Sequence, residues 1–511
     1  MSNKTQNTDA TWRILTDQAL GEGRQEFGHD GLSFKEYAEV LADVALSDSP
    51  LTIGVFGEWG TGKTSLMRMI EKELKGRGDK NIVTVWFNAW RYEQETHPIV
   101  PLVASIIKEL ESKKNVADKA GETRRSLVRA LRAVAYGFSA NAKVKVPGLA
   151  EVEAGFVAKD MIDREAALSH DPLLDRSLNY AAFERLEEIV KDVGGESESS
   201  MPKIVVLVDD LDRCFPDSAI RLLESIKLVL AQPGFVFILG VARKVIEGYL
   251  EHRYDTEYGI KDFKSASYLD KIVQVPFPIP SHTGRIEDFS KKVLERVGEK
   301  YRQDLESVLP IIAIASESNP RTVVRFVNNL QIDKRIAATI TSQDSKKIKE
   351  IPLEFFAVTR CLQFRWSDIF AKLAVAPDDF CLEVADYSKE KEARKKKSSD
   401  EADDGAPQAG KREIPSPAVL TLLKNHENLQ RFLASEPGQN WLRDGELRRA
   451  AVSFLRTQRQ EPETERERAV RQRREGQQRA ESEALARVKE LHQELPKYTN
   501  RLVPCNFYIF G

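Results

Sequence analysis

Short, almost wholly apolar runs alternate with longer amphipathic stretches through the first 280 residues of the chain. A short run without polar alternation is typical of a strand that is buried on both faces of a sheet. In the longer stretches, the apolar residues recur at helical spacing. Strands that alternate with helices predict an α/β fold, with a parallel sheet covered by helices on both faces. The five predicted strands are residues 51–56, 82–87, 203–208, 235–241 and 272–276.

The helical pattern shows where this unit begins and where a second, helical region follows it. Ser33, with Glu36 three positions later, has the spacing of a capping box and predicts the start of the first helix. From Pro280 to about Val375 the pattern is helical, with a break at Asn319-Pro320. We expect the following organisation: an N-terminal arm, 1–30; a core, 31–110 and 201–282; an insertion between the second and third strands, 111–200; a helical region, 283–388; a linker, 389–417; and a mostly helical accessory region with a charged helix, 418–511.

Composition narrows the class of protein. The 511 residues include 77 Lys and Arg against 79 Asp and Glu, and this near balance gives no overall field for wrapping nucleic acid. The four cysteines show no C-x-x-C spacing, which argues against a zinc ribbon and fits a reducing compartment. The chain starts without an apolar export signal, and its best apolar run, Ala133–Ala142, is too short to span a bilayer. We therefore expect a soluble, cytoplasmic protein.

A glycine-rich turn follows the first predicted strand and precedes an amphipathic helix. Its sequence, Gly57-Glu-Trp-Gly-Thr-Gly-Lys-Thr64, fits the P-loop pattern G-x-x-x-x-G-K-[ST] in the required strand–helix setting. Glycine lets successive backbone N–H groups converge on an anion, and the helix adds the positive end of its dipole. Lys63 is expected to reach the β- and γ-phosphates, and Thr64 to bind Mg²⁺. The predicted nucleotide-binding residues are Gly57, Glu58, Trp59, Gly60, Thr61, Gly62, Lys63, Thr64 and Ser65.

Acidic residues follow the third predicted strand. Asp209 ends the strand and is the expected second ligand of Mg²⁺ or of its water. Asp210 is placed to orient or deprotonate an attacking water, with helix capping as the alternative. For Asp212 and Arg213 two interpretations stay open. The two side chains pair with each other, or Arg213 faces the nucleotide of a neighbouring subunit.

Five motifs in this order resemble the KAP family of P-loop NTPases, and the resemblance covers roughly residues 15–335. Beside the two motifs above, they are Phe87-Asn-Ala-Trp90, Tyr268-Leu-Asp-Lys-Ile-Val-Gln-Val-Pro-Phe277, and Asn319-Pro-Arg321 with Arg325-Phe-Val-Asn-Asn329. The family is similar to the STAND and AAA+ branches, in which an additional strand separates the strands of the phosphate and acidic motifs. The resemblance implies binding of ATP or GTP and a helical lid in 283–388.

The resemblance also raises the question of a membrane. Relatives often carry membrane-spanning helices between the two motifs, whereas the insertion here has no convincing span. Peripheral contact with the inner face of the cell membrane therefore stays open. Within the insertion, the basic amphipathic stretch Arg124–Arg132 either lies on an anionic membrane or, as we favour, docks against another helix.

Further residues are candidates by position. Arg321 is the lid arginine that would reach the γ-phosphate and act in catalysis, with surface pairing as the alternative. Asn88 is a candidate hydrogen-bonding partner near the site, while Phe87 and Trp90 are predicted to lie in the core. Relatives tend to carry an acidic residue where Ala242 stands, so a polar group that senses the γ-phosphate is missing there.

We therefore expect a Mg²⁺-dependent P-loop NTPase, with ATP as the expected nucleotide and GTP as the alternative. Hydrolysis would drive conformational change or assembly with a second copy or with a partner protein from the same operon, by analogy in defence against phage. Ala242 favours a second hypothesis, an ATP-gated scaffold that seldom hydrolyses. A nucleic-acid-dependent motor is the third, and its only obvious basic segment is the linker run Lys395–Lys397.

Overall fold

The computed structural model describes most of the predicted core and of the helical region that follows it. The described residues are 14–22, 27–79, 81–95, 97–112, 119–142, 186–188, 190, 202–229, 232–260, 264–343, 351–375 and 427–458. The predicted linker, 389–417, lies outside them, as do most of the predicted insertion, 111–200, and most of the predicted accessory region, 418–511.

A five-stranded parallel sheet forms the centre of the N-terminal half, in the order β2-β3-β4-β1-β5. The strands are β1, Leu51–Phe56; β2, Ile82–Asn88; β3, Lys203–Asp209; β4, Phe235–Val241; and β5, Val275–Pro278. Strand β4 lies between β1, which leads into the glycine-rich turn, and β3, which ends in Asp209. The additional strand that the family resemblance implies is therefore present.

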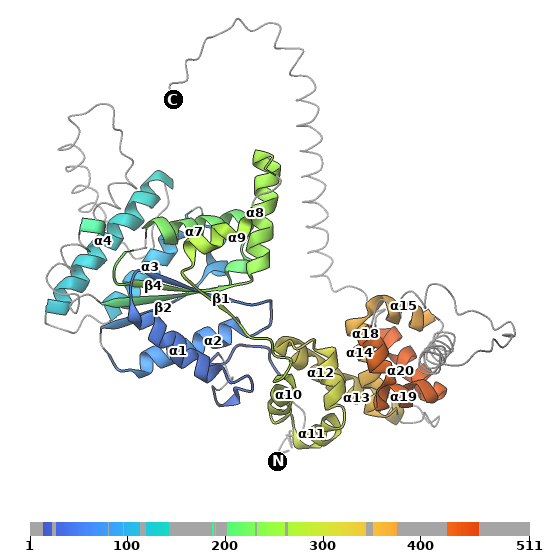
Figure 1. Cartoon of the computed structure of the whole chain (residues 1–511). Helices are drawn as coiled ribbons and strands as arrows, with labels where there is room; N and C mark the ends of the chain where they lie inside the picture. Colours follow the sequence, from blue (N-terminus) through green and yellow to red (C-terminus); the bar gives the residue numbers. More distant parts are fainter. Residues whose placement is uncertain are drawn as a thin grey trace, which may run out of the picture.

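Helices cover both faces of this sheet (Figure 1). On one face lie α1, Phe34–Ser47, and α2, Lys63–Gly76. On the other face lie α3, Ile99–Ser112; α4, Lys119–Ala142; α7, Pro216–Val229; α8, Arg243–Tyr258; and α9, Ser265–Ile272. Every residue of β4 is buried, because side chains on both faces of the sheet pack against helices. The predicted α/β fold is confirmed.

Helix α4 settles how the basic amphipathic stretch is used in the structure. Leu127, Leu131 and Val134 are buried in the same core as residues of α3, so the apolar stripe docks against another helix. Among the described residues, no helix combines the length and the apolar composition needed to cross a bilayer.

Two local predictions were wrong. The fifth strand begins at Val275 instead of 272, because the Val273 N–H bonds to the Leu269 carbonyl and prolongs α9 through Ile272. The capping box at Ser33 does not form, because this residue has φ 55° and its side chain makes no capping bond. Instead, the Asp30 carboxylate accepts hydrogen bonds from the backbone N–H groups of Leu32 and Lys35.

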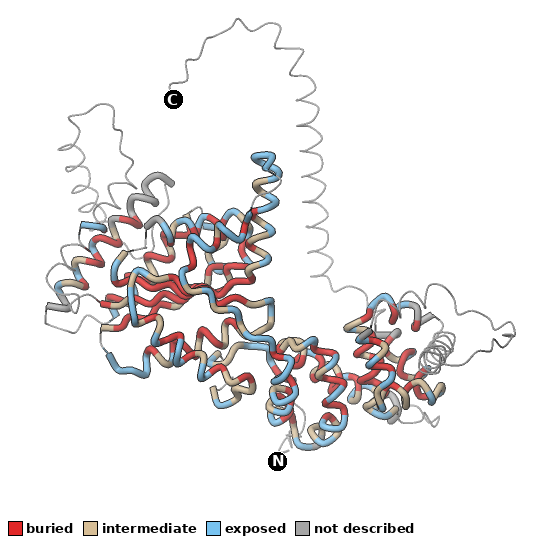
Figure 2. The backbone as a smooth tube through the Cα atoms, in the orientation of Figure 1, coloured by how far each residue is buried: buried red, intermediate tan, exposed pale blue. Residues whose placement is uncertain are grey.

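A second hydrophobic core lies in the helices that follow β5, and Figure 2 shows it as a separate buried region. These helices are α10, Ile286–Leu294; α11, Glu299–Glu306; α12, Leu309–Ala315; α13, Pro320–Gln343; α14, Leu353–Arg365; α15, Ser367–Val375; α18, Glu427–Ala434; α19, Glu436–Arg443; and α20, Gly445–Gln458. The predicted break at Asn319-Pro320 is the start of α13. Within α13, fully buried Asp333 accepts two hydrogen bonds of 2.6 Å from Arg360 of α14, which fixes the two helices together. We call α10–α13 the lid helices.

Candidate functional site

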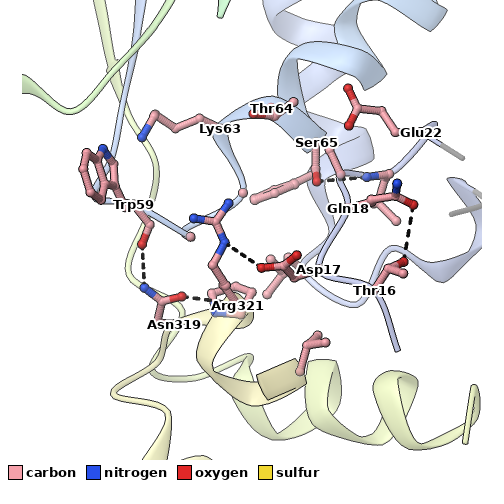
Figure 3. A pocket seen from close by; sticks show the side chains of 18 of the residues that line it. Thr16, Asp17, Gln18, Glu22, Trp59, Lys63, Thr64, Ser65, Asn319 and Arg321 are labelled. Atoms are coloured by element: carbon pink, nitrogen blue, oxygen red, sulfur yellow. Dashed lines mark hydrogen bonds and ion pairs between the residues drawn. The ribbon is translucent and has the colours of Figure 1, made fainter. Parts of the chain in front are cut away.

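A cavity of about 820 Å³ opens at the carboxyl ends of β1 and β3 (Figure 3). Its walls come from the glycine-rich turn, the acidic end of β3, the start of α13 and the N-terminal segment 16–22. This volume lies in the range of sites that bind small molecules. Parallel sheets form such sites at the carboxyl ends of their strands.

The glycine-rich turn adopts a conformation that requires its glycines. Gly60 and Gly62 have φ values of 84° and 99°, in the left-handed region that other residues rarely adopt. A Cβ atom at Gly62 would also lie 2.6 Å from the Phe34 ring. The turn ends where α2 begins at Lys63, and no side chain caps this helix end. The first N–H groups of a helix lack intrahelical partners, and Lys63, Thr64 and Ser65 line the cavity, so this helix start can bind an anion there.

Lys63 is the first residue of α2, and it is only 8% exposed. Its Nζ donates to the carbonyl oxygens of Gly57, at 2.9 Å, and Glu58, at 3.3 Å. It also forms an ion pair of 3.2 Å with Asp212. The ammonium group is therefore held at the loop by two carbonyl oxygens and one carboxylate.

Asp212 connects three parts of the site. Beyond Lys63, it accepts hydrogen bonds from the Trp59 indole N–H, at 3.0 Å, and from the Ala242 backbone N–H, at 2.9 Å. Of the two interpretations left open for Asp212 and Arg213, the structure does not show their mutual pairing: Asp212 pairs with Lys63, and Arg213 pairs with Asp210. The short 3₁₀ turn Leu211–Arg213 directs Asp212 toward the turn and lets Arg213 reach back to Asp210.

Asp209 is 3% exposed, and its carboxylate lies beside the hydroxyl of Thr64. Burial, together with the negative charge of Asp210, raises the pKa of Asp209 to about 6, although the hydrogen bond from Thr64 lowers it. Among the described residues, no Lys or Arg forms an ion pair with this carboxylate. A hydroxyl and an uncompensated carboxylate are oxygen ligands that suit Mg²⁺. These two residues therefore fit the predicted metal site.

Asp210 has partners on both carboxylate oxygens. Arg213 Nε lies 2.8 Å from Oδ1, and Asn88 Nδ2 donates to Oδ2 at 2.8 Å. The prediction that Asn88 hydrogen-bonds near the site is confirmed. Phe87 is buried as predicted, whereas Trp90 is 50% exposed and lies under the Arg213 guanidinium, so the prediction that Trp90 belongs to the core is wrong. It follows the end of β2, where the chain turns outward.

A match to a family sequence model identifies the family of this chain. The sequence model of the KAP family P-loop domain matches residues 33–337, which include both strand ends and the start of α13. The chain belongs to the KAP family.

Individual relatives are distant. The phage T7 exclusion protein of Escherichia coli strain K12 is 23% identical over 338 residues, which make up 62% of this chain and 44% of that protein. An uncharacterized protein of Methanocaldococcus jannaschii is 23% identical over 172 residues, or 30% of this chain and 89% of that one. The solved Aeropyrum pernix ORC2 protein, in ADPNP–ADP complexes, aligns over 77% of this chain and 85% of its own, at 10% identity and a TM-score of 0.29. The chain spans less than half of the phage exclusion protein's length.

Not every residue of the predicted loop lines the cavity of the KAP domain. Trp59, Gly60, Gly62, Lys63, Thr64 and Ser65 do, whereas Gly57, Glu58 and Thr61 lie outside its lining. Glu58 instead forms an exposed ion pair of 3.1 Å with Lys244. The predicted lid arginine, Arg321, lines the cavity beside the loop and forms an ion pair of 3.4 Å with Asp17 (Figure 3).

Sequence reasoning assigned no role in the site to the segment that supplies Asp17. Residues 16–20 and Glu22 line the cavity beside α13, and the Leu20 N–H donates to the Ser65 hydroxyl at 3.1 Å. The backbone of Leu15 exchanges two hydrogen bonds with the Asn328 side chain of α13. No sequence motif predicts a role for this segment, because its contacts are with residues that are far away in the sequence.

The raised pKa of Asp209 predicts a stability effect that depends on pH. A carboxyl whose pKa is higher in the folded state than in the unfolded state destabilises the fold where it is ionised. Here this penalty is fully present above about pH 6, and it disappears as the pH falls to the ordinary pKa of 3.8. One pKa unit corresponds to about 1.4 kcal/mol. Asp209→Asn should therefore raise the thermal midpoint of the nucleotide-free protein by a few degrees at pH 8, measured by calorimetry, and by less at pH 5. The exposed Asp217→Asn is the matched control, and an unchanged or lowered midpoint for Asp209→Asn at pH 8 would contradict the prediction.

Proposed function

We propose that the cavity binds ATP with Mg²⁺ and that the KAP domain hydrolyses this nucleotide. The observation that carries the proposal is the buried Lys63 ammonium at the open N-terminus of α2, beside the Thr64–Asp209 pair. Together they supply a cation, the N–H groups of a helix start that no side chain caps, and hard oxygen ligands around one cavity. A triphosphate with its divalent ion needs all three.

Each group has a role that its position supports. The amides of Gly60–Thr64 and the ammonium of Lys63 hold the phosphates. Thr64 and Asp209 hold the metal, which supplies charge neutralisation on the phosphate oxygens when it is bound. Arg321, at the start of α13, lines the cavity beside the loop and stabilises negative charge that develops on the terminal phosphate.

Asp210 is the general base in this proposal, and its contacts set a condition on catalysis. Arg213 contacts one of its oxygens and Asn88 the other. Each carboxylate oxygen can accept a second hydrogen bond, so the attacking water must use an acceptor position that these two side chains leave open. Apolar Ala242 after β4 favours the second candidate, a scaffold that binds ATP and hydrolyses it slowly or not at all.

Asp210→Asn separates the two candidates. In the hydrolytic proposal, this change lowers the turnover of ATP by at least ~100-fold, because a general base contributes roughly 10²–10⁴ to rate. Its affinity for ATP stays within about threefold of wild type. Phosphate release by the purified chain measures turnover, and Asp217→Asn on the exposed start of α7 is the control. A turnover that Asp210→Asn leaves unchanged would contradict the catalytic role and support the scaffold.

We further propose that the chain acts in defence against phage, through assembly with a second copy or with a partner. The support is the relationship to the phage T7 exclusion protein, a distant one that covers only part of that protein.

Plating efficiency tests the defence role in Escherichia coli that expresses the chain with its neighbouring genes. The wild type should lower plaque formation by phage T7 or by other phages at least tenfold. Lys63→Met, which keeps the length of the side chain but removes its charge, should abolish the protection, while Lys244→Met should retain it. Loss of protection in Asp210→Asn as well would show that hydrolysis is needed. Wild-type cells that remain fully sensitive to every phage tested would contradict this role.

A further inference from the structure

Three successive carbonyl oxygens of the P-loop accept hydrogen bonds from the lid side of the cavity. Asn319 Nδ2 donates to the Trp59 oxygen at 2.7 Å, and the backbone N–H of Arg321 lies 3.4 Å from the Gly60 oxygen. His282 Nε2 lies 2.8 Å from the Thr61 oxygen. Figure 3 shows the first of these contacts beside Arg321. Asn319 and Arg321 are at the start of α13, and His282 is in the connection between β5 and α10.

The Asn319 contact is built into the start of α13. Its Oδ1 accepts from the backbone N–H groups of Arg321, at 3.0 Å, and Thr322, at 3.4 Å, so that one side chain caps the helix and holds the loop. The two residues before it, Glu317 and Ser318, both have positive φ values, of 50° and 60°. Two consecutive non-glycine residues in the left-handed region are unusual and carry backbone strain. The tight turn brings Asn319 to the loop.

Gly60 shows how closely the lid approaches. A Cβ atom at this position would lie 2.5 Å from Asn319 Oδ1 and 2.8 Å from Arg321 Cβ. The space that a side chain would occupy is therefore filled by the lid. Gly60 is required by this contact as well as by its positive φ.

His282 is almost completely buried and packs against the Phe34 ring, with the ring centroids 5.8 Å apart. A carbonyl oxygen can only accept, so Nε2 carries the proton in this contact. Burial lowers the pKa of His282 below its ordinary value, which keeps the ring neutral. The imidazole therefore links the loop to the joint that leads into the lid helices.

Because the peptide bond is planar, a carbonyl group that the lid holds also fixes the N–H group of the next residue. The carbonyls of Trp59, Gly60 and Thr61 belong to the same rigid peptide units as the N–H groups of Gly60, Thr61 and Gly62. The P-loop pattern assigns N–H groups of this loop to phosphate. In this structure the Thr61 N–H donates to the Glu58 oxygen at 3.3 Å, so a phosphate would have to draw it away from that carbonyl. A phosphate that reorients these N–H groups must also move the carbonyls that the lid holds.

We propose that Asn319 and His282 are positioning residues that transmit nucleotide binding from the P-loop peptide units to the lid helices. The proposal rests on the proposed binding of nucleotide in this cavity. The transmission needs no contact between a lid side chain and the terminal phosphate. ADP should therefore move the lid as well as a triphosphate does.

Hydrogen–deuterium exchange of the full chain, with and without ADP and Mg²⁺, tests this proposal. Two segments are compared. The first is the P-loop with the start of α2, 57–66, and the second is the part of the lid helices from α12 into α13, 309–330. In the wild type, saturating ADP should slow exchange at least threefold in both segments. In the double variant Asn319→Ser/His282→Phe, the P-loop response should remain and the lid response should fall by more than half.

The variants separate signalling from folding. Ser at 319 keeps an oxygen that caps α13 but is too short to reach the loop, and Phe at 282 keeps the packing against Phe34 but removes the donor. In a chain that keeps Asn319, His282→Gln supplies an N–H donor at a similar distance. This variant should therefore recover part of the lid response that His282→Phe removes. A lid response as large in the double variant as in the wild type would overturn the proposal, as would a wild-type lid that responds only to a triphosphate. A wild-type P-loop without any ADP response would instead overturn the proposed nucleotide binding, and this proposal with it.

Discussion

The buried ion pair between Lys63 and Asp212 organises the carboxyl edge of the sheet. A buried charge is costly unless it is paired and hydrogen-bonded. Two loop carbonyls and one carboxylate satisfy the Lys63 ammonium, and the same carboxylate receives N–H groups from Trp59 and Ala242. The turn after β1, the end of β3 and the end of β4 thereby meet at a single carboxylate. The rest of the cavity is arranged around this positive centre.

The two faces of the P-loop have different partners. Toward the cavity it presents N–H groups, Lys63 and the Thr64 hydroxyl, with the uncompensated Asp209 carboxylate nearby. Toward the lid it presents carbonyl oxygens, which Asn319 and Arg321 contact. One side of the P-loop therefore lies near a carboxylate that can bind a cation, and the other side contacts the lid helices. This arrangement suits the switch that we propose for this chain.

Sequence patterns predicted what local and layered constraints determine. Strands β1 to β4 were found within one residue of their bounds, because strands covered on both faces need continuous apolar residues. Strand β5 was misplaced, because an edge strand with Pro276 and Pro278 has a weaker pattern and partly exposed residues. The P-loop pattern also located the turn between β1 and α2, since its geometry is local. Contacts between distant parts could not be read in the same way. Asp212 bonding to the loop, the exposure of Trp90 and the role of Asp17 in the cavity all depend on how separate elements pack.

Calorimetric titration with ATP and Mg²⁺ tests the central claim, that the Lys63 cradle binds a triphosphate. The wild type should bind one ATP per chain, and Lys63→Met should bind at least ~30-fold more weakly, which corresponds to about 2 kcal/mol. Lys244→Met, which removes only an exposed ion pair with Glu58, should bind like the wild type. A folded Lys63→Met protein with wild-type affinity for ATP would contradict the account.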